Sequence, residues 1–239
     1  MRKTELHIEK LQEVFGNKDY FQVEDLFVFY QSYDPIVAKS TVNWRIYTLL
    51  KTGVVKRIGR GKYKCGNGNT FTPQISEKAL KINNLMKNNF PYLKYITWHI
   101  SEINSVSQHL INKDTYYVEV ERDAVDTVFE QLREKFKYVL RGKTNEDVYF
   151  GESIIVVRSL VTGSPVQLVK NVPTTTIEKL LVDLFCDKEF EFLQGYELTH
   201  IFNNAFSKYT INVNKLLRYA SRKAKREQLY EFINAIKRQ

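Results

Sequence analysis

Apolar residues in the first 65 positions recur at helical spacing in three short segments. The stripe of Leu6, Leu11, Val14 and Phe15 is typical of an amphipathic helix, and Gly53 suits the left-handed position that follows a helix. Two short β-prone runs then flank a turn bounded by Gly59 and Gly61. The pattern predicts helices over residues 4–15, 23–30 and 40–51, and a hairpin of strands over 54–58 and 62–65. Three helices followed by a basic hairpin are typical of a winged helix-turn-helix.

After a glycine-rich stretch at residues 66–70, segments with the apolar spacing of helices alternate with segments that have the spacing of strands. Helical spacing is predicted over 75–88, 101–111, 123–136, 177–186, 190–203, 212–219 and 223–236, and strands over 95–99, 115–121, 153–161 and 166–172. We therefore expect an α+β protein with a winged helix-turn-helix domain over 1–66, a linker over 67–76, and a mixed α/β domain with a helical C-terminus over 77–239.

Composition narrows the function classes. The chain has 239 residues, of which 43% are hydrophobic, so it is long enough to bury a sizeable core. The apolar runs are short and interrupted by charge, and the start of the chain has no signal-peptide pattern, so we expect a cytoplasmic protein without membrane contact. Cys65 and Cys186 lie far apart, and the four histidines form no ligand spacing, so no metal or other cofactor is expected.

Positive charge is concentrated at the two ends of the chain. Residues 1–72 hold 12 Lys/Arg against 7 Asp/Glu, residues 73–214 hold 16 against 18, and residues 215–239 hold 8 against 2. The respective net charges are +5, −2 and +6. This division indicates contact with a polyanion by one or both ends, and the basic C-terminal segment fits either a phosphate-binding face or an acidic partner.

The strongest functional signal lies between Ala38 and Lys64, which contains eight Lys/Arg and no Asp/Glu. If Val42, Ile46, Leu49 and Leu50 face inward, the polar side of the third helix is free to enter a major groove. Asn43 and Arg45 are the candidates for base edges, since these side chains pair bidentately with adenine and guanine. The predicted DNA-binding residues are Lys39, Ser40, Thr41, Asn43, Arg45, Lys51, Lys56, Arg57, Arg60 and Lys62.

Two runs resemble the AbiEi-type antitoxins of type IV toxin–antitoxin systems. One is Ser40-Thr41-Val42-Asn43-Trp44-Arg45 with the following Gly53 to Tyr63 segment, and the other is residues 172–184, with Glu178-Lys179 and Asp183. The resemblance covers the first 65 residues well and the rest loosely. It implies an antitoxin that represses its own operon through double-stranded DNA at its promoter, and a functional link to a nucleotidyltransferase-like toxin. It also implies a degenerate nucleotidyltransferase-like fold for the second domain.

Two alternatives remain open from the residues. An active nucleotidyltransferase, targeted to nucleic acid by the first domain, would need paired strand carboxylates for magnesium. Alternation places Glu119 and Glu121 on one face of a strand, but no Gly-Ser turn precedes them, so we expect a solvent-facing pair in a domain that is not an enzyme. The second alternative is a winged helix that docks another protein.

Overall fold

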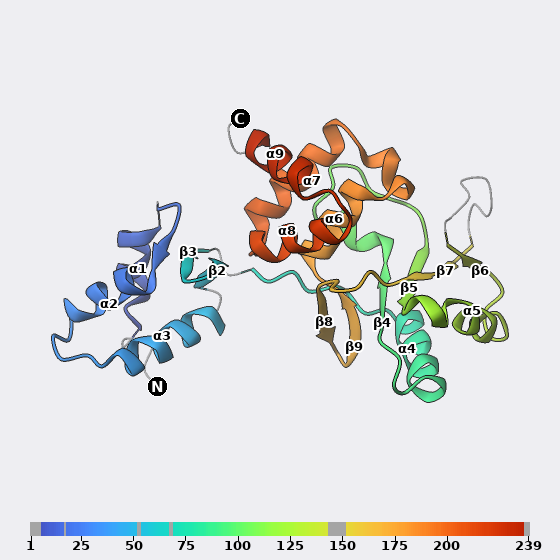
Figure 1. Ribbon diagram of the computed structural model, residues 1–239, viewed down its shortest axis with the longest axis horizontal. Coiled ribbons are helices and arrows are strands. Elements are labelled where there is room, and N and C mark those ends of the chain that lie inside the picture. Colours follow the sequence, from blue (N-terminus) through green and yellow to red (C-terminus); the bar gives the residue numbers. More distant parts are fainter. Residues whose placement is uncertain (1–5, 17, 52–53, 67–68, 143–151, 237–239) are drawn as a thin grey trace. The chain divides into compact units, whose positions relative to one another are not determined.

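The computed structural model of the chain describes residues 6–16, 18–51, 54–66, 69–142 and 152–236. The predicted start of the first helix at Thr4, the glycine at position 53 and positions 67–68 of the predicted linker lie outside these residues. The described part has the mixed α and β composition that the sequence predicts, with sheets of antiparallel and of mixed strand direction (Figure 1).

The chain divides into two compact units. The first comprises Met1–Phe71 and Phe206–Lys215, and the second comprises Thr72–Ala205 and Leu216–Gln239. No helix in the described part of the chain is both long and apolar enough to cross a membrane.

Among its described residues, the Met1–Phe71 part of the first unit contains three helices and a small sheet. In chain order these are α1 (Ile8–Phe15), β1 (Phe21–Gln22), α2 (Val23–Gln31), α3 (Lys39–Lys51), β2 (Val55–Gly59) and β3 (Lys62–Cys65). The sheet is antiparallel throughout, in the order β1-β3-β2. The three predicted helices and the hairpin are confirmed, whereas β1 was not predicted because two residues carry no periodicity.

The core of the first unit is rich in aromatic residues from α1, β1 and α2. The ring centroids of Phe15 and Phe21 lie 4.5 Å apart, and Phe29 packs edge-on against Phe15 and Tyr30. Such offset and edge-to-face pairs add stability beyond the area that they bury. Helix α3 joins this core through its apolar stripe, so its position in the unit is fixed by burial.

The second unit is built on a four-stranded sheet. Its elements are α4 (Glu77–Asn89), β4 (Tyr95–His99), η2 (Ile100–Ser105), β5 (Thr115–Val120), η3 (Arg122–Ala124), α5 (Val125–Arg133), β6 (Val139–Arg141), β7 (Ile154–Ser159), β8 (Val166–Val169), β9 (Val172–Thr175), α6 (Ile177–Cys186), η4 (Lys188–Leu193), α7 (Tyr196–Lys208), α8 (Val213–Arg222) and α9 (Arg226–Ile236). Of α7 and α8, residues 206–208 and 213–215 are counted with the first unit. The sheet order is β4-β5-β7-β6, in which β4 is antiparallel to β5 and the other pairs are parallel.

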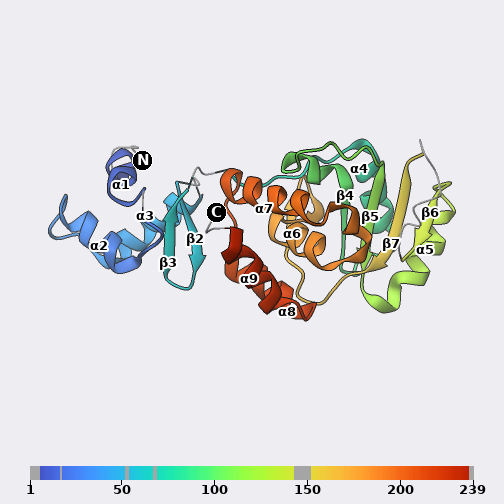
Figure 2. The same ribbon diagram turned by 90° about the horizontal axis from the view of Figure 1, so that it is seen from above.

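Helices cover both faces of this sheet. Figure 1 shows α4 and α5 on one face, where Ile82, Met86 and Leu132 pack against Val118 and Val157. Helices α6 to α9 gather on the other face, as the view of Figure 2 also shows. Polar and charged strand residues on that second face are therefore buried beneath α6.

Three sequence predictions in the second unit were wrong in detail. The helix expected over 101–111 is only the short 3-10 helix η2, and the strand expected over 166–172 is the hairpin β8–β9. Lys170 and Asn171 both have positive φ, of 48° and 63°, which gives the two-residue turn that favours a hairpin. The helix expected over 190–203 is split into η4 and α7 at Gly195, whose φ is +71°.

Candidate nucleic-acid interface

Helix α3 separates apolar and polar residues onto two sides. Val42, Ile46 and Leu49 are buried, as the sequence predicted, and Leu50 is half-buried. The opposite side exposes two large aromatic residues, since Trp44 is 43% and Tyr47 is 63% exposed. Lys39, Ser40, Thr41, Asn43 and Lys51 are exposed beside them. Five of the ten predicted contact residues therefore lie on the solvent side of one helix.

The β2–β3 hairpin presents a second basic element of the same unit. Its turn requires Gly61, whose φ is +69°, and Arg60 next to it is exposed. The Arg57 side chain is fixed along the strand because its Nε donates to the Gly59 carbonyl oxygen at 3.2 Å. The hairpin is anchored in the core by Val55 and Tyr63, so its cations project from a fixed base.

Arg45 differs from the other predicted contact residues. It is half-buried, and its guanidinium carbon lies 4.6 Å from the centroid of the Tyr30 ring. Tyr30 is itself buried, donates its hydroxyl proton to the Leu6 carbonyl oxygen at 3.0 Å, and has a pKa raised by burial to about 12. Arg45 is therefore packed on a rigid neighbour, whereas Asn43 extends freely into solvent.

Tyr20 contacts one of the predicted DNA-binding residues, Lys62, although its position in the sequence did not suggest it. The Lys62 ammonium lies 4.3 Å from the centroid of the Tyr20 ring, and Tyr20 is 45% exposed. The contact arises because β1 pairs with β3, with Gln22 opposite Lys62. A two-residue strand gives no sequence signal, so only the structure could bring Tyr20 and Lys62 together.

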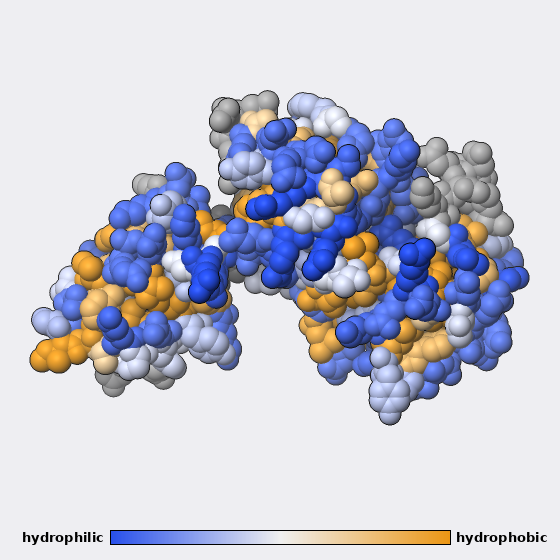
Figure 3. Space-filling model, viewed as in Figure 1, coloured by the Kyte–Doolittle hydropathy of each residue, from blue (hydrophilic) through white to orange (hydrophobic). Residues whose placement is uncertain are grey.

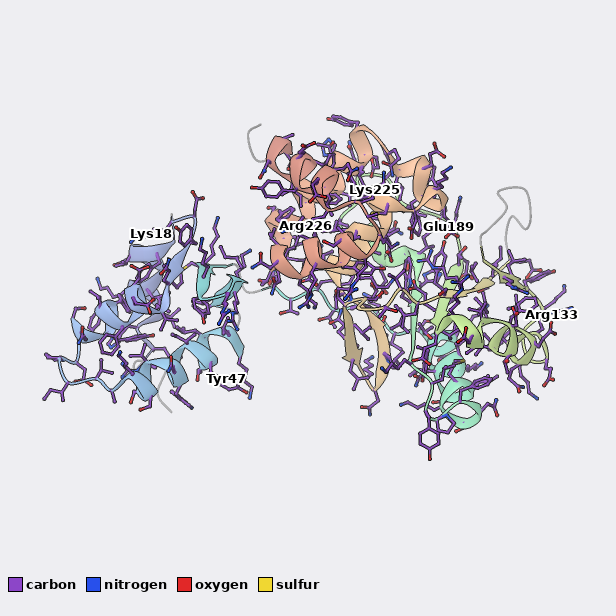
Figure 4. All side chains as sticks on the ribbon, in the orientation of Figure 1. Lys18, Tyr47, Arg133, Glu189, Lys225 and Arg226 are labelled. Carbon is purple, nitrogen blue, oxygen red and sulfur yellow. The ribbon has the colours of Figure 1, made fainter. Side chains whose placement is uncertain are left out.

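Five of the cations on α3 and the β2–β3 hairpin lack carboxylate partners in the part of the chain that the structure describes. We define the α3–hairpin surface by Lys39, Asn43, Lys51, Arg57, Arg60 and Lys62. None of its five cations forms an ion pair with a carboxylate among the residues that the structure describes. In Figure 4, Tyr47 lies on the opposite side of the first unit from Lys18, which belongs to the segment after α1. The positive charge of the α3–hairpin surface is thus available to an external anion.

The carboxylates considered for magnesium do not form a solvent-facing pair. Strand β5 ends at Val120, so Glu121 lies beyond the strand and is exposed. Glu119 is only 2% exposed, because α6 covers that face of the sheet. The expected pair is therefore wrong: one carboxylate is buried and the other is in solvent. Among the described residues, no group of three metal-ligating side chains could hold an ion.

Glu119 is instead the centre of a buried ionic cluster. Its carboxylate accepts hydrogen bonds from the Lys179 ammonium at 2.8 Å, from Arg158 Nη2 at 2.8 Å and from the Trp98 indole N–H at 2.8 Å. Burial on its own would raise the pKa of Glu119, but Lys179 and Arg158 hold the pKa below its usual value. Glu119 is an ionised carboxylate that already has its counter-ions.

Helix α6 supplies the other half of the cluster. Thr176 caps the helix by accepting the Lys179 backbone N–H at 3.3 Å, and Lys179 is bonded to Asp183 one turn later at 2.5 Å. Asp183 also accepts a hydrogen bond from the Tyr219 hydroxyl at 2.9 Å and forms an ion pair with Lys223 at 2.6 Å. The second run that resembles the antitoxin family is thus a structural element of the described second unit.

Both cysteines, Cys65 and Cys186, are free thiols and half-buried. Burial raises the pKa of Cys65 to about 11 and that of Cys186 to about 12. Neither thiol is activated as a nucleophile, since the thiolate is the reactive form.

Residues 41–239 match a sequence family described as a family of unknown function, DUF6577. No curated protein matches the chain.

Proposed function

The chain belongs to the DUF6577 family, and we propose that it is a double-stranded DNA-binding repressor of its own promoter, which it contacts through the α3–hairpin surface. The observation that carries the proposal is an exposed helix side and an adjoining hairpin with five cations and no paired carboxylate among the described residues. A single α-helix fits the major groove, and cations that lack internal partners gain most from meeting phosphates.

The order of elements in the first unit supports a winged helix-turn-helix. In that motif the second helix of a helix pair enters the major groove and the hairpin lies beside it. Helices α2 and α3 would form the pair, with α3 as the recognition helix and β2–β3 as the wing. Asn43 is exposed in the N-terminal half of α3, where base contacts are made, and Arg60 is at the tip of the wing.

The antitoxin role extends this proposal through the resemblance alone. A repressor of this kind would control an operon that encodes a nucleotidyltransferase-like toxin, and the second unit would have a degenerate nucleotidyltransferase-like fold. We assign no catalytic role to Glu119, because Lys179 and Arg158 occupy the carboxylate that would bind magnesium. Co-expression with the neighbouring gene tests the antitoxin role: growth that is arrested by that gene alone should be restored.

The test of DNA binding uses the purified full chain and the DNA immediately upstream of its own gene, with scrambled DNA of equal length as reference. We expect a preference for the upstream DNA and a steep loss of affinity with salt. If six phosphates are contacted, affinity should fall by about three orders of magnitude between 50 and 200 mM salt.

Two double variants locate the surface. Lys51→Gln/Arg60→Gln removes two cations of the α3–hairpin surface, and Lys10→Gln/Lys18→Gln removes two from the α1 side of the same unit. The first variant should reduce the slope of log affinity against log salt by about 1.8, and the second should leave it unchanged. Equal slopes for both variants would reject this surface, and no salt-dependent binding by the wild type would favour a protein-docking module.

A further inference from the structure

A second group of exposed cations lies on the C-terminal helices. Helix α8 buries Leu216, Leu217, Tyr219 and Ala220 in the second unit. Arg218 and Arg222, four residues apart, are therefore on its opposite, exposed side. Figure 3 shows hydrophilic residues over the part of the surface where Figure 1 draws α8.

The turn between α8 and α9 adds two more exposed cations, Lys225 and Arg226. Ala224 has a φ of +56°, and the Lys225 N–H donates to the Ala220 carbonyl oxygen at 3.0 Å, which closes α8. Lys223 points inward, where its ammonium lies 2.6 Å from both Asp183 and Asp187. This inward anchor fixes the turn, and Lys225 and Arg226 (labelled in Figure 4) remain exposed.

The position of Arg222 is also restricted. Its Nε lies 3.5 Å from the point that a Cβ on Gly163 would occupy, so it rests against the bare backbone of that turn. A side chain held against a neighbouring turn loses less conformational entropy on binding than one that moves freely.

Two of these cations, Lys225 and Arg226, are placed unfavourably for the stability of α9 alone. Lys225 immediately precedes α9 and Arg226 is its first residue, at the end where the helix dipole is positive and anions are preferred. Glu227 follows in the first turn. Among the described residues, no carboxylate forms an ion pair with Arg218, Arg222, Lys225 or Arg226.

We propose that Arg218, Arg222, Lys225 and Arg226 form a second phosphate-binding surface, the C-terminal basic surface, which contacts the DNA backbone without reading bases. The inference rests on the proposed function. Three of the four residues are arginines, whose planar guanidinium groups match phosphate oxygens in pairs. Contacts to phosphates add affinity on every sequence and do not change the preference for one.

The experiment compares two triple variants of the full chain on the same upstream and scrambled DNA. Arg218→Gln/Arg222→Gln/Arg226→Gln neutralises the C-terminal basic surface. Lys81→Gln/Arg122→Gln/Lys135→Gln removes the same charge from exposed positions elsewhere in the second unit. Because the first variant no longer neutralises three phosphates, its salt slope should decrease by about 2.7, so the wild type should lose about 40-fold more affinity than the variant between 50 and 200 mM salt.

Each outcome decides between the two proposals. A decreased slope on both DNAs, with an unchanged preference and an unchanged matched control, supports the C-terminal basic surface. A wild-type slope in the arginine variant overturns it, and if Lys51→Gln/Arg60→Gln still weakens binding, the proposed function stands alone. If the wild type binds no DNA, both proposals fail. Should the triple variant unfold, as judged by circular dichroism, Arg218→Gln alone must reduce the slope by about 0.9.

Discussion

Replacing Lys179 with methionine tests the interpretation of the buried ionic cluster. Lys179 is fully buried and bonded to Glu119 at 2.8 Å and to Asp183 at 2.5 Å. The substitution keeps the apolar volume but leaves two buried carboxylates short of one cation. Removing one partner of a buried ion pair costs about 3 to 5 kcal/mol, because the remaining charge is not solvated. We expect this loss in the free energy of unfolding at neutral pH.

The pH dependence of the loss makes the prediction specific. In the wild type, burial would raise the pKa values of Glu119 and Asp183, but Lys179 and the neighbouring cations hold both below their usual values. Depressed carboxylate pKa values give stability that is present above the pKa of the unfolded chain and is lost as the pH falls. Without Lys179 the pKa values of both carboxylates rise, so they are protonated at a higher pH in the variant than in the wild type. Protonation removes the unpaired buried charge. The deficit should therefore be largest at pH 7 to 8 and should shrink toward pH 4.

Urea unfolding followed by circular dichroism at several pH values measures this deficit. Lys81→Met, at an exposed position of α4, is the matched control and should change stability by less than about 0.5 kcal/mol. If Lys179→Met is unfolded at neutral pH, the double variant Lys179→Met/Glu119→Gln is measured in addition. It should recover stability because one unpaired charge is removed. A deficit below about 1 kcal/mol, or one that is the same at every pH, would refute the reasoning.

Two further predictions concern single side chains of the second unit. Burial raises the pKa of Glu102 to about 7 from 4.5, although the Gln74 backbone N–H donates to it at 2.9 Å. A raised pKa gives stability that is lost as the pH rises from 4.5 to 7. The free energy of unfolding of Glu102→Gln should therefore exceed that of the wild type by up to about 3 kcal/mol at pH 8 and equal it at pH 4. Parallel urea titrations decide this, and identical pH profiles for the two proteins would exclude it. Ala224→Gly should stabilise the chain by about 1 kcal/mol, since only glycine adopts a φ of +56° without strain; a lower midpoint of thermal unfolding would contradict this.

The sequence predicted those elements whose residues determine them locally. The apolar stripes of α2 and α3, the glycines of the β2–β3 turn and the threonine cap of α6 all act within a few positions of the chain. Strands β1 and β6, of two and three residues, exist only because a partner strand pairs with them. Their formation depends on contacts made by distant parts of the chain, which periodicity cannot reveal.

The error at Glu119 has the same cause. Strand alternation gives the face on which a side chain lies, but it does not say whether a helix covers that face. The counter-ions Arg158 and Lys179 lie 39 and 60 positions further along the chain. A lone carboxylate within a strongly apolar strand was the available signal, because a charge is buried there only when it is paired.

The contrast between paired and unpaired cations connects the stability of the chain to its proposed function. Arg158, Lys179 and Lys223 are each committed to buried carboxylates, and they tie β7, α6 and the α8–α9 turn together. The exposed cations of α3, the hairpin and the C-terminal helices that make up the two basic surfaces have no such partner among the described residues. Like charges gathered at a surface repel one another and destabilise the folded chain. An external polyanion removes that repulsion, and this is the physical reason why the unpaired cations, rather than the buried cluster, are where we expect DNA.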